Sequence, residues 1–226
     1  MFEPIFEEKI IPVISIVAKG EFGVRVVNSL MYPAKIYCLK FEELEELSKN
    51  DMTFIVADKL NEEEWAKIRR ATSNPIVVVG CSMPEEVEFA SCSFNETSTE
   101  LCSKIIKSII DILTQEGLVD IDFADIHRIL FECGKHAKAG YAKNMLAKDA
   151  TRKILNQLGD KSVSLDKAKG VLINIVAGEQ LEFKEVDLIT QTIIEKTNQE
   201  ATIIFGTRFD TNKSGKELDL SVVVTY

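Results

Sequence analysis

Apolar runs alternate with helical patterns through the first half of the chain, and this alternation limits the possible fold more than any other feature. The runs are short and rich in Val and Ile. They lack the polar alternation of a half-exposed strand, so each predicts a strand buried on both faces. Strands that alternate with helices need crossover connections, which imply a parallel sheet covered by helices. The predicted strands are 12–18, 34–39, 53–57 and 75–80. The predicted helices are 22–31, 41–47 and a third that Asn61 caps, with Glu64 as its capping-box partner, and that ends at Ala71.

The second half of the chain has a different order of elements. Gly117 is predicted to end a helix at 96–115, because glycine often follows the last turn. One face of this helix carries an apolar stripe of Leu101, Ile105, Ile106, Ile109, Ile112 and Leu113. The elements predicted beyond it are a helix beginning within 117–130, a polar helix at 143–158, strands at 170–177, 201–209 and 217–226, and a helix at 183–197. The turn at 210–215 predicts that the last two strands pair antiparallel.

These patterns predict an α/β protein with three parts. An abridged Rossmann-like domain with a parallel sheet is expected at 1–93, and a connecting core helix at 94–117. A smaller α+β domain is expected at 118–226.

Charge and cysteine usage exclude several classes of protein. The formal net charge is −9, which argues against general binding to nucleic acid or anionic membranes, because phosphate contacts need clustered Lys and Arg. Acidic residues precede the first apolar run, where a secretory signal has basic ones, and no run approaches the roughly 18 residues of a membrane span. The cysteines are scattered without paired spacing, which predicts reduced thiols and a cytoplasmic protein: Cys38, Cys81, Cys92, Cys102 and Cys133. Cys133 and His136 have no second pair beside them, so packing is favoured over a metal site.

The stretch "GLVDIDFADIHRIL", 117–130, places Asp120, Asp122 and Asp125 between two apolar patterns. Two interpretations of these aspartates stay open. Asp122 stands where a helix N-cap belongs, and Asp125 at the third helical position favours the helix dipole. Alternatively, the carboxylates form a site on an exposed loop.

This stretch and three later segments resemble FtsZ, the bacterial relative of tubulin. "GLVDIDFADI" resembles the family's G-L-I-N-V-D-F-A-D-V, and "GVLINIVAG" its G-V-L-V-N-I-T-G-G strand. "ATIIFGTRFD" resembles A-x-I-I-F-G-x-x-x-D, and "ELDLSVVVTY" the closing strand E-L-R-V-T-V-I-A-T-G. The matches are ordered, collinear and correctly spaced. They imply that 118–226 is a C-terminal domain of the FtsZ type.

In that family, the aspartate stretch is the loop that one subunit inserts into the nucleotide site of the next. Its acidic residues help to position the attacking water and the cation, so that hydrolysis occurs between subunits. The family's Asn falls on Asp120, and its two Asp residues fall on Asp122 and Asp125. The resemblance therefore implies a partner-contact loop, with one negative charge more than the family's.

The resemblance also implies that the guanine-nucleotide site is degraded. "DMTFIVA" resembles the family strand that precedes G-G-G-T-G-T-G, yet "DKLNEEEWAKIRR" follows it here. Phosphate loops are rich in glycine because backbone N–H groups must approach the phosphate oxygens, whereas Glu62, Glu63 and Glu64 would repel a triphosphate. The family's earlier glycine loop is reduced to Gly20 and Gly23, which a plain strand-to-helix turn also explains. Phe94 is present before the central helix, but the position of the family's Asp that contacts guanine falls near Thr99, and no Asp is found there.

Three hypotheses about function follow. The first is a non-catalytic FtsZ-like interaction or assembly protein, linked to cell division or filament regulation, without a cofactor or metal. Its partner would be FtsZ, another tubulin-like protein or a second copy of the chain. The second is a divergent GTPase of the superfamily, and the third is a structural homo-oligomer that reuses the fold.

Overall fold

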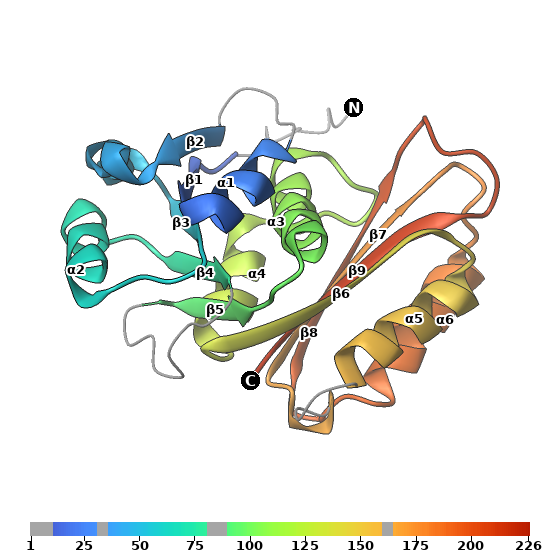
Figure 1. The fold of residues 1–226 in the computed structure, drawn as a ribbon. Helices are drawn as coiled ribbons and strands as arrows, with labels where there is room; N and C mark the ends of the chain where they lie inside the picture. Colours follow the sequence, from blue (N-terminus) through green and yellow to red (C-terminus); the bar gives the residue numbers. More distant parts are fainter. Residues whose placement is uncertain (1–10, 31–35, 81–89, 160–164) are drawn as a thin grey trace, which may run out of the picture.

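The computed structural model describes residues 11–30, 36–80, 90–159 and 165–226. A nine-stranded sheet runs through the whole chain in the order β2-β1-β3-β4-β5-β6-β9-β7-β8. Helices cover both of its faces, and α3 lies between the two halves of the molecule (Figure 1). In the part of the chain that is described, no helix is long and apolar enough to cross a membrane.

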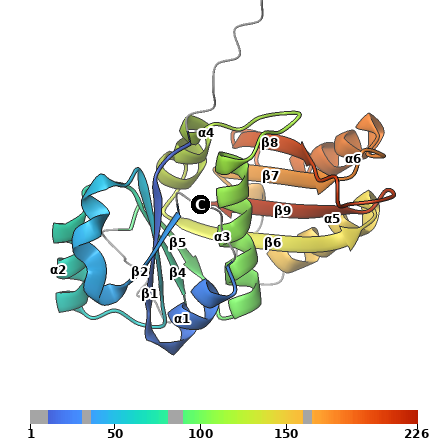
Figure 2. The ribbon, with the colours of Figure 1, turned by 90° about the horizontal axis from the view of Figure 1, so that it is seen from above.

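The first half is the parallel sheet that the alternation of patterns predicted. All five strands pair in parallel with their neighbours. The strands are β1 Ile14–Lys19, β2 Ile36–Lys40, β3 Met52–Ala57, β4 Ile76–Gly80 and β5 Cys92–Asn95. The helical elements are α1 Gly20–Asn28, the 3₁₀ helix η1 Phe41–Lys49, α2 Glu62–Ala71 and α3 Thr99–Thr114. Viewed from above, α1 and α3 cover one face of this sheet and α2 the other (Figure 2).

Alternate side chains of the central strands enter two different cores, which is why these strands are apolar throughout. Phe54 on β3 packs with α1 and α3, whereas its neighbour Ile55 packs with Trp65 and Ile68 of α2. The capping box that begins α2 is as predicted. Asn61 Oδ1 accepts from the Glu64 N–H at 2.9 Å, and Glu64 Oε2 accepts from the Asn61 N–H at 2.9 Å.

The second half is a four-stranded mixed region of the sheet with two helices on its outer face. Its elements are α4 Phe123–His127, the π-helical turn η2 Arg128–Glu132, β6 His136–Met145, α5 Ala147–Gly159, the 3₁₀ turn η3 Leu165–Lys167, β7 Gly170–Ala177, α6 Phe183–Ile194, β8 Thr202–Phe209 and β9 Leu218–Thr225. The α5 and α6 helices bury one face of this region, and α3 with α4 covers the other. β6 joins the two halves by pairing with β5 on one side and β9 on the other.

Three sequence predictions were wrong. β5 and β6 were not predicted from the sequence, and the polar helix predicted to begin at Lys143 begins at Ala147 instead, because Lys143 lies in β6. The segment "HAKAGYAKNM" has little intrinsic strand propensity. It is a strand because small residues let α5 approach closely: a Cβ at Gly140 would lie 3.1 Å from Ile154 Cδ1. The segment 210–215 is not a hairpin turn, because β9 pairs antiparallel with β6 and β7, while β8 pairs in parallel with β7 at the edge.

The end of α3 also differs from its prediction. The helix starts after Ser98, whose Oγ accepts from the Leu101 N–H at 3.2 Å, and it ends at Thr114. Gly117 lies beyond the last turn and does not have a left-handed backbone. Glycine is needed at this position because the chain passes close to β8: a Cβ there would lie 2.7 Å from the Thr207 carbonyl oxygen.

Candidate functional site

The predicted partner-contact residues lie between α3 and α4, on the segment 117–125. Asp122 is the N-cap of α4: its Oδ1 accepts from the Asp125 N–H at 2.8 Å, and Asp125 Oδ2 accepts from the Asp122 N–H at 3.3 Å. Asp120 Oδ1 accepts from the Gly117 N–H at 2.8 Å. The structure therefore brings Asp122 and Asp125 together in a reciprocal cap, while Asp120 closes a separate turn. Although both side chains accept these local hydrogen bonds, Asp120 and Asp122 are exposed to solvent.

The same segment lies along the edge of the sheet (Figure 2). Val119 forms an antiparallel bridge with Thr207, and the Leu118 N–H donates to the Thr207 carbonyl oxygen at 2.7 Å. Large apolar side chains are exposed on this segment and on β8: Leu118 is 69% exposed, and Val119 and Phe205 are each 40% exposed. We call Leu118, Val119, Asp120, Asp122 and Phe205 the loop–edge surface. It combines apolar area with negative charge, as docking surfaces do.

A second region lies where β1 leads into α1, the position of the family's earlier glycine loop. Gly20 has a left-handed φ of +71°, and a Cβ at Gly23 would lie 2.2 Å from the Val56 carbonyl oxygen. Both glycines therefore have structural reasons to be present. The Asp58 carboxylate occupies the start of α1, where Oδ2 accepts from the Phe22 N–H at 3.3 Å. A helix N-terminus is a favourable place for an anion, and here the chain supplies its own.

The segment after β3 leads directly into α2. Glu62, Glu63 and Glu64 form its first turn, and Glu64 both completes the capping box and forms an ion pair with Lys19. Glu63 pairs with Lys67, and the hydrogen bond from that lysine lowers the pKa of the Glu63 carboxyl below its ordinary value. Glu64 thus contacts the end of β1 through Lys19, whereas Glu62 and Glu63 lie on α2, which covers the other face of the sheet from α1 (Figure 2).

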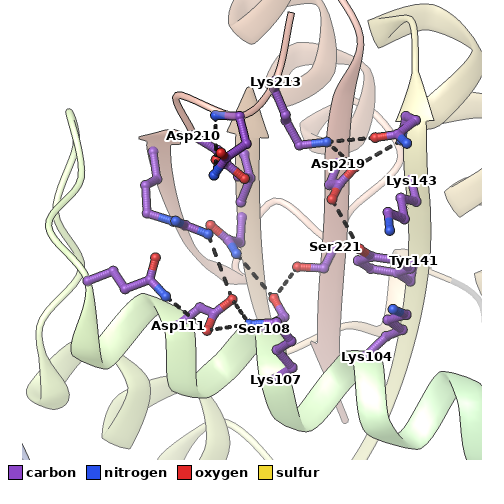
Figure 3. Close-up of a pocket in the computed structure, with 16 residues that line it drawn as sticks. Lys104, Lys107, Ser108, Asp111, Tyr141, Lys143, Asp210, Lys213, Asp219 and Ser221 are labelled. Atoms are coloured by element: carbon purple, nitrogen blue, oxygen red, sulfur yellow. Dashed lines mark hydrogen bonds and ion pairs between the residues drawn. The ribbon is translucent and has the colours of Figure 1, made fainter. Parts of the chain in front are cut away.

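A polar hollow lies between α3 and the C-terminal part of the sheet (Figure 3). It has a volume of about 560 Å³. α3 supplies Lys104, Lys107, Ser108 and Asp111, its C-cap supplies Gln115, and the strands and the segment before β9 supply the rest. This cleft was not predicted from the sequence. The sequence feature that indicates the cleft is a stripe of polar residues, spaced three and four apart, along the otherwise apolar α3.

Two hydrogen-bonded networks hold the walls of this cleft. In the first, Asp111 accepts from Lys107 Nζ at 2.7 Å and lies 3.7 Å from Arg208 NH2, which ties α3 to β8. In the second, Asp219 Oδ1 accepts from Lys213 Nζ at 2.7 Å, and Asp219 Oδ2 accepts from the Tyr141 hydroxyl at 3.2 Å. Burial, and next the Asp219 carboxylate, raise the pKa of the Tyr141 hydroxyl above its ordinary value. Tyr141 therefore remains a hydrogen-bond donor at neutral pH.

Within the described ranges, no group of three or more His, Cys, Asp or Glu side chains is arranged to hold a metal ion. Cys133 is partly exposed. His136 Nδ1 lies 3.2 Å from Ser93 Oγ, at the junction of β5 and β6. Cys38 and Cys81 lie among residues whose side chains are not described.

Comparisons with known proteins agree with this geometry. Residues 134–226 match the FtsZ family, C-terminal domain. The mitochondrial division protein fszA of Dictyostelium discoideum is 31% identical over 172 residues, which are 74% of this chain and 32% of that protein. The cell division protein FtsZ of Caulobacter vibrioides is 36% identical over 123 residues, which are 53% of this chain and 24% of that protein. The matched segments thus span a third or less of these curated relatives.

Solved structures share the fold along nearly the whole chain. An empty FtsZ dimer of M. jannaschii superposes with a TM-score of 0.71 at 18% identity, covering 95% of this chain and 88% of that one. TubZ of Bacillus thuringiensis serovar israelensis, solved as GDP-form protofilaments, superposes with a TM-score of 0.68 at 8% identity. The superposition covers 95% of this chain and 85% of the TubZ chain. The sheet order, α3 and the C-terminal region define a protein of the FtsZ/tubulin superfamily, and the chain belongs to it. Within that superfamily, its residues 134–226 correspond to the C-terminal domain of FtsZ.

Proposed function

We propose that this chain is a non-catalytic FtsZ-like assembly protein that contacts another tubulin-like subunit through its loop–edge surface. The observation that carries the proposal is the exposure of Leu118 beside Asp120 and Asp122. Leu118 is 69% exposed and its neighbour Val119 is 40% exposed, so this segment at β8 offers contiguous apolar surface that a partner can bury. The bridge between Val119 and Thr207 holds the segment in one position before any partner arrives.

The absence of catalysis is proposed from the region around α1 and α2. A bound triphosphate would need backbone N–H groups to face its oxygens, but the Asp58 carboxylate already accepts from the Phe22 N–H there. Glu62, Glu63 and Glu64 form the first turn of α2, where a glycine-rich phosphate loop would be expected after β3. The negative charge of the Asp58 carboxylate at the start of α1 opposes the binding of a phosphate group there.

The relatives support a role in assembly. Their printed descriptions include proteins of bacterial and mitochondrial division, an FtsZ dimer and TubZ protofilaments. For this chain, we propose a role in division or filament regulation through contact with such a subunit. An enzymatic role, as a divergent GTPase, is the alternative that the first prediction tests. Location in the cytoplasm stays a prediction.

The first prediction concerns GTP. Isothermal titration of the chain with GTP and magnesium is expected to give no saturable binding in the micromolar range, because the Asp58 carboxylate occupies the start of α1 and repels phosphates, and no glycine-rich loop follows β3. A polymerising FtsZ titrated in the same buffer is the positive control. A saturating isotherm with one GTP per chain would establish the divergent GTPase instead.

The second prediction concerns a partner subunit. Addition of the chain to polymerising FtsZ is expected to lower both GTP turnover and light scattering, because the extra charge of Asp120 favours capping over activation. The variant Leu118→Ser with Asp120→Asn and Asp122→Asn removes the apolar contact and two charges. Asn is also a good N-cap, so the start of α4 is retained. The concentration for half-inhibition should rise by about tenfold or more, since loss of a central interface side chain costs more than about 1 kcal/mol.

The matched control for this experiment is Glu42→Gln with Glu45→Gln. These exposed residues lie on η1, at the opposite end of the sheet, and the change in net charge equals that of the loop variant. The control should inhibit as the unmodified chain does. No effect of the unmodified chain on either signal, together with oligomers of the chain alone in sedimentation velocity, would favour the structural homo-oligomer.

A further inference from the structure

The cleft between α3 and the C-terminal sheet takes no part in the proposed assembly surface, yet its lining is that of a binding site. Of the sixteen residues around its 560 Å³, Val176 is the only one with an aliphatic side chain. Pockets for apolar ligands are lined mostly by apolar and aromatic side chains. This cleft therefore suits a small, polar ligand that makes many hydrogen bonds.

The cleft is positively charged, although the whole chain has a net charge of −9. Its carboxylates are Asp111, Asp210 and Asp219, and its cations are Lys104, Lys107, Lys143, Arg208 and Lys213. The cations exceed the carboxylates by two positive charges. Because clefts with low-dielectric walls focus the field of their charges, the local potential favours an anion.

The excess charge gathers at one end of the cleft. Lys107 and Arg208 share Asp111, and Lys213 pairs with Asp219. Lys104 and Lys143 form no ion pair with any described residue, and both lie beside Tyr141 (Figure 3). Lys104 Nζ is 5.8 Å from the centre of the Tyr141 ring. A second hollow of about 380 Å³ shares Lys104, Tyr141 and Lys143 with the cleft, and its own lining adds one cation, Lys153, and one carboxylate, Glu100.

The floor of the cleft is a buried polar network that is already in place. Asn174, Ser108 and Ser221 are 6–7% exposed, and Asp111 is 8% exposed. The Asn174 Nδ2 donates to Ser108 Oγ at 3.2 Å, and the hydroxyls of Ser108 and Ser221 are hydrogen-bonded to each other. Because these groups are already ordered, they bind hydroxyl groups of a ligand with little further loss of conformational entropy.

We propose that this cleft binds a small, hydroxyl-bearing phosphomonoester, with the phosphate between Lys104 and Lys143 and the polar body over Ser108, Asn174 and Ser221. A phosphomonoester carries a charge of about −1.5 to −2 near neutral pH, which matches the excess of two positive charges. Its three terminal oxygens accept charge-assisted hydrogen bonds from more than one ammonium group. The ligand would contact both α3 and the C-terminal sheet.

The test is isothermal titration of the full chain at low ionic strength with ribose 5-phosphate, glucose 6-phosphate and glycerol 3-phosphate. Ribose and inorganic phosphate are titrated separately. At least one ester is expected to bind saturably with one molecule per chain. Ribose should not bind, and inorganic phosphate should bind about tenfold or more weakly than the ester, because it makes no contact with the floor.

Two variants with equal changes in net charge complete the test. Lys104→Gln with Lys143→Gln should weaken ester binding by about tenfold or more. Lys148 and Lys167 are exposed residues outside the cleft, so Lys148→Gln with Lys167→Gln should leave ester binding unchanged. Circular dichroism should confirm that both double variants are folded. Failure of all three esters to bind, equal weakening by both variants, or inorganic phosphate as strong as the ester would each overturn the proposal. None of these outcomes depends on FtsZ or GTP, so the proposed assembly role is tested separately.

Discussion

Gly23→Ala is expected to lower the free energy of unfolding by about 3 kcal/mol, at the upper end of what overpacking costs. The Cβ would lie 2.2 Å from the Val56 carbonyl oxygen and 3.1 Å from its carbonyl carbon. These atoms belong to the backbone of β3, a central strand, and cannot move aside as a side chain can. The α1 helix must therefore shift away from the sheet, which opens the core around Phe22 and Val26. Urea unfolding followed by circular dichroism measures the change.

Gly159→Ala is the matched control for that substitution. Gly159 ends α5, and a Cβ there would have no heavy atom within 4 Å. The free energy of unfolding should change by less than about 0.5 kcal/mol, as for ordinary surface substitutions. Equal unfolding midpoints for the two variants would mean that α1 does not pack on β3 at this distance.

Asp111→Ala is also expected to cost about 3 kcal/mol, since removing one partner of a buried ion pair leaves the other charge desolvated. The side chain of Asp111 is 12% exposed, and that of Arg208, its partner on β8, is 19% exposed. Gln115 Nε2 also donates to Asp111 Oδ1 at 3.2 Å, so a third group loses its acceptor. The loss should weaken the attachment of α3 to the edge of the C-terminal sheet. The same urea titration detects it.

Asp149→Ala supplies the comparison for an exposed pair. Asp149 lies 2.8 Å from Arg152 NH2, but the two side chains are 43% and 71% exposed. Water screens such a pair, so its removal should cost no more than about 0.5 kcal/mol. Should Asp111→Ala prove as mild as Asp149→Ala, the carboxylate at Asp111 would not be a structural link between α3 and β8.

The sequence predicted most elements of the parallel half correctly, because those strands are apolar on both faces. The β3 residues Phe54 and Ile55 enter opposite cores, and that environment leaves a continuous apolar run that can be recognised without a structure. Caps were equally clear, as at Asn61 and Asp122, because a cap depends on residues three positions apart. The proposed division at 1–93, 94–117 and 118–226 stays a prediction, and a single sheet runs through all three parts.

The candidate functional regions also differ in whether the sequence alone predicts them. The aspartates at Asp120, Asp122 and Asp125 were found from sequence, since they lie within one short stretch. The cleft was missed, because it joins Lys104 on α3 to Tyr141 on β6 and Asn174 on β7, which only packing brings together. The exposure of Leu118 could not be predicted either, as its pattern is that of a buried residue.

The sequence by itself determined the order of most helices and strands, the parallel first sheet, the capped helix starts and the resemblance of 118–226 to FtsZ. These features depend on side chains close together along the chain, or on burial that affects a whole run of residues. Only the tertiary structure decided that β9 lies between β6 and β7, that β6 is a strand, and that Asp58 occupies the start of α1. The physical reason is that each of these depends on contacts between distant segments. The free energy of those contacts outweighs the local preference of a turn such as 210–215 or of a weak strand such as β6.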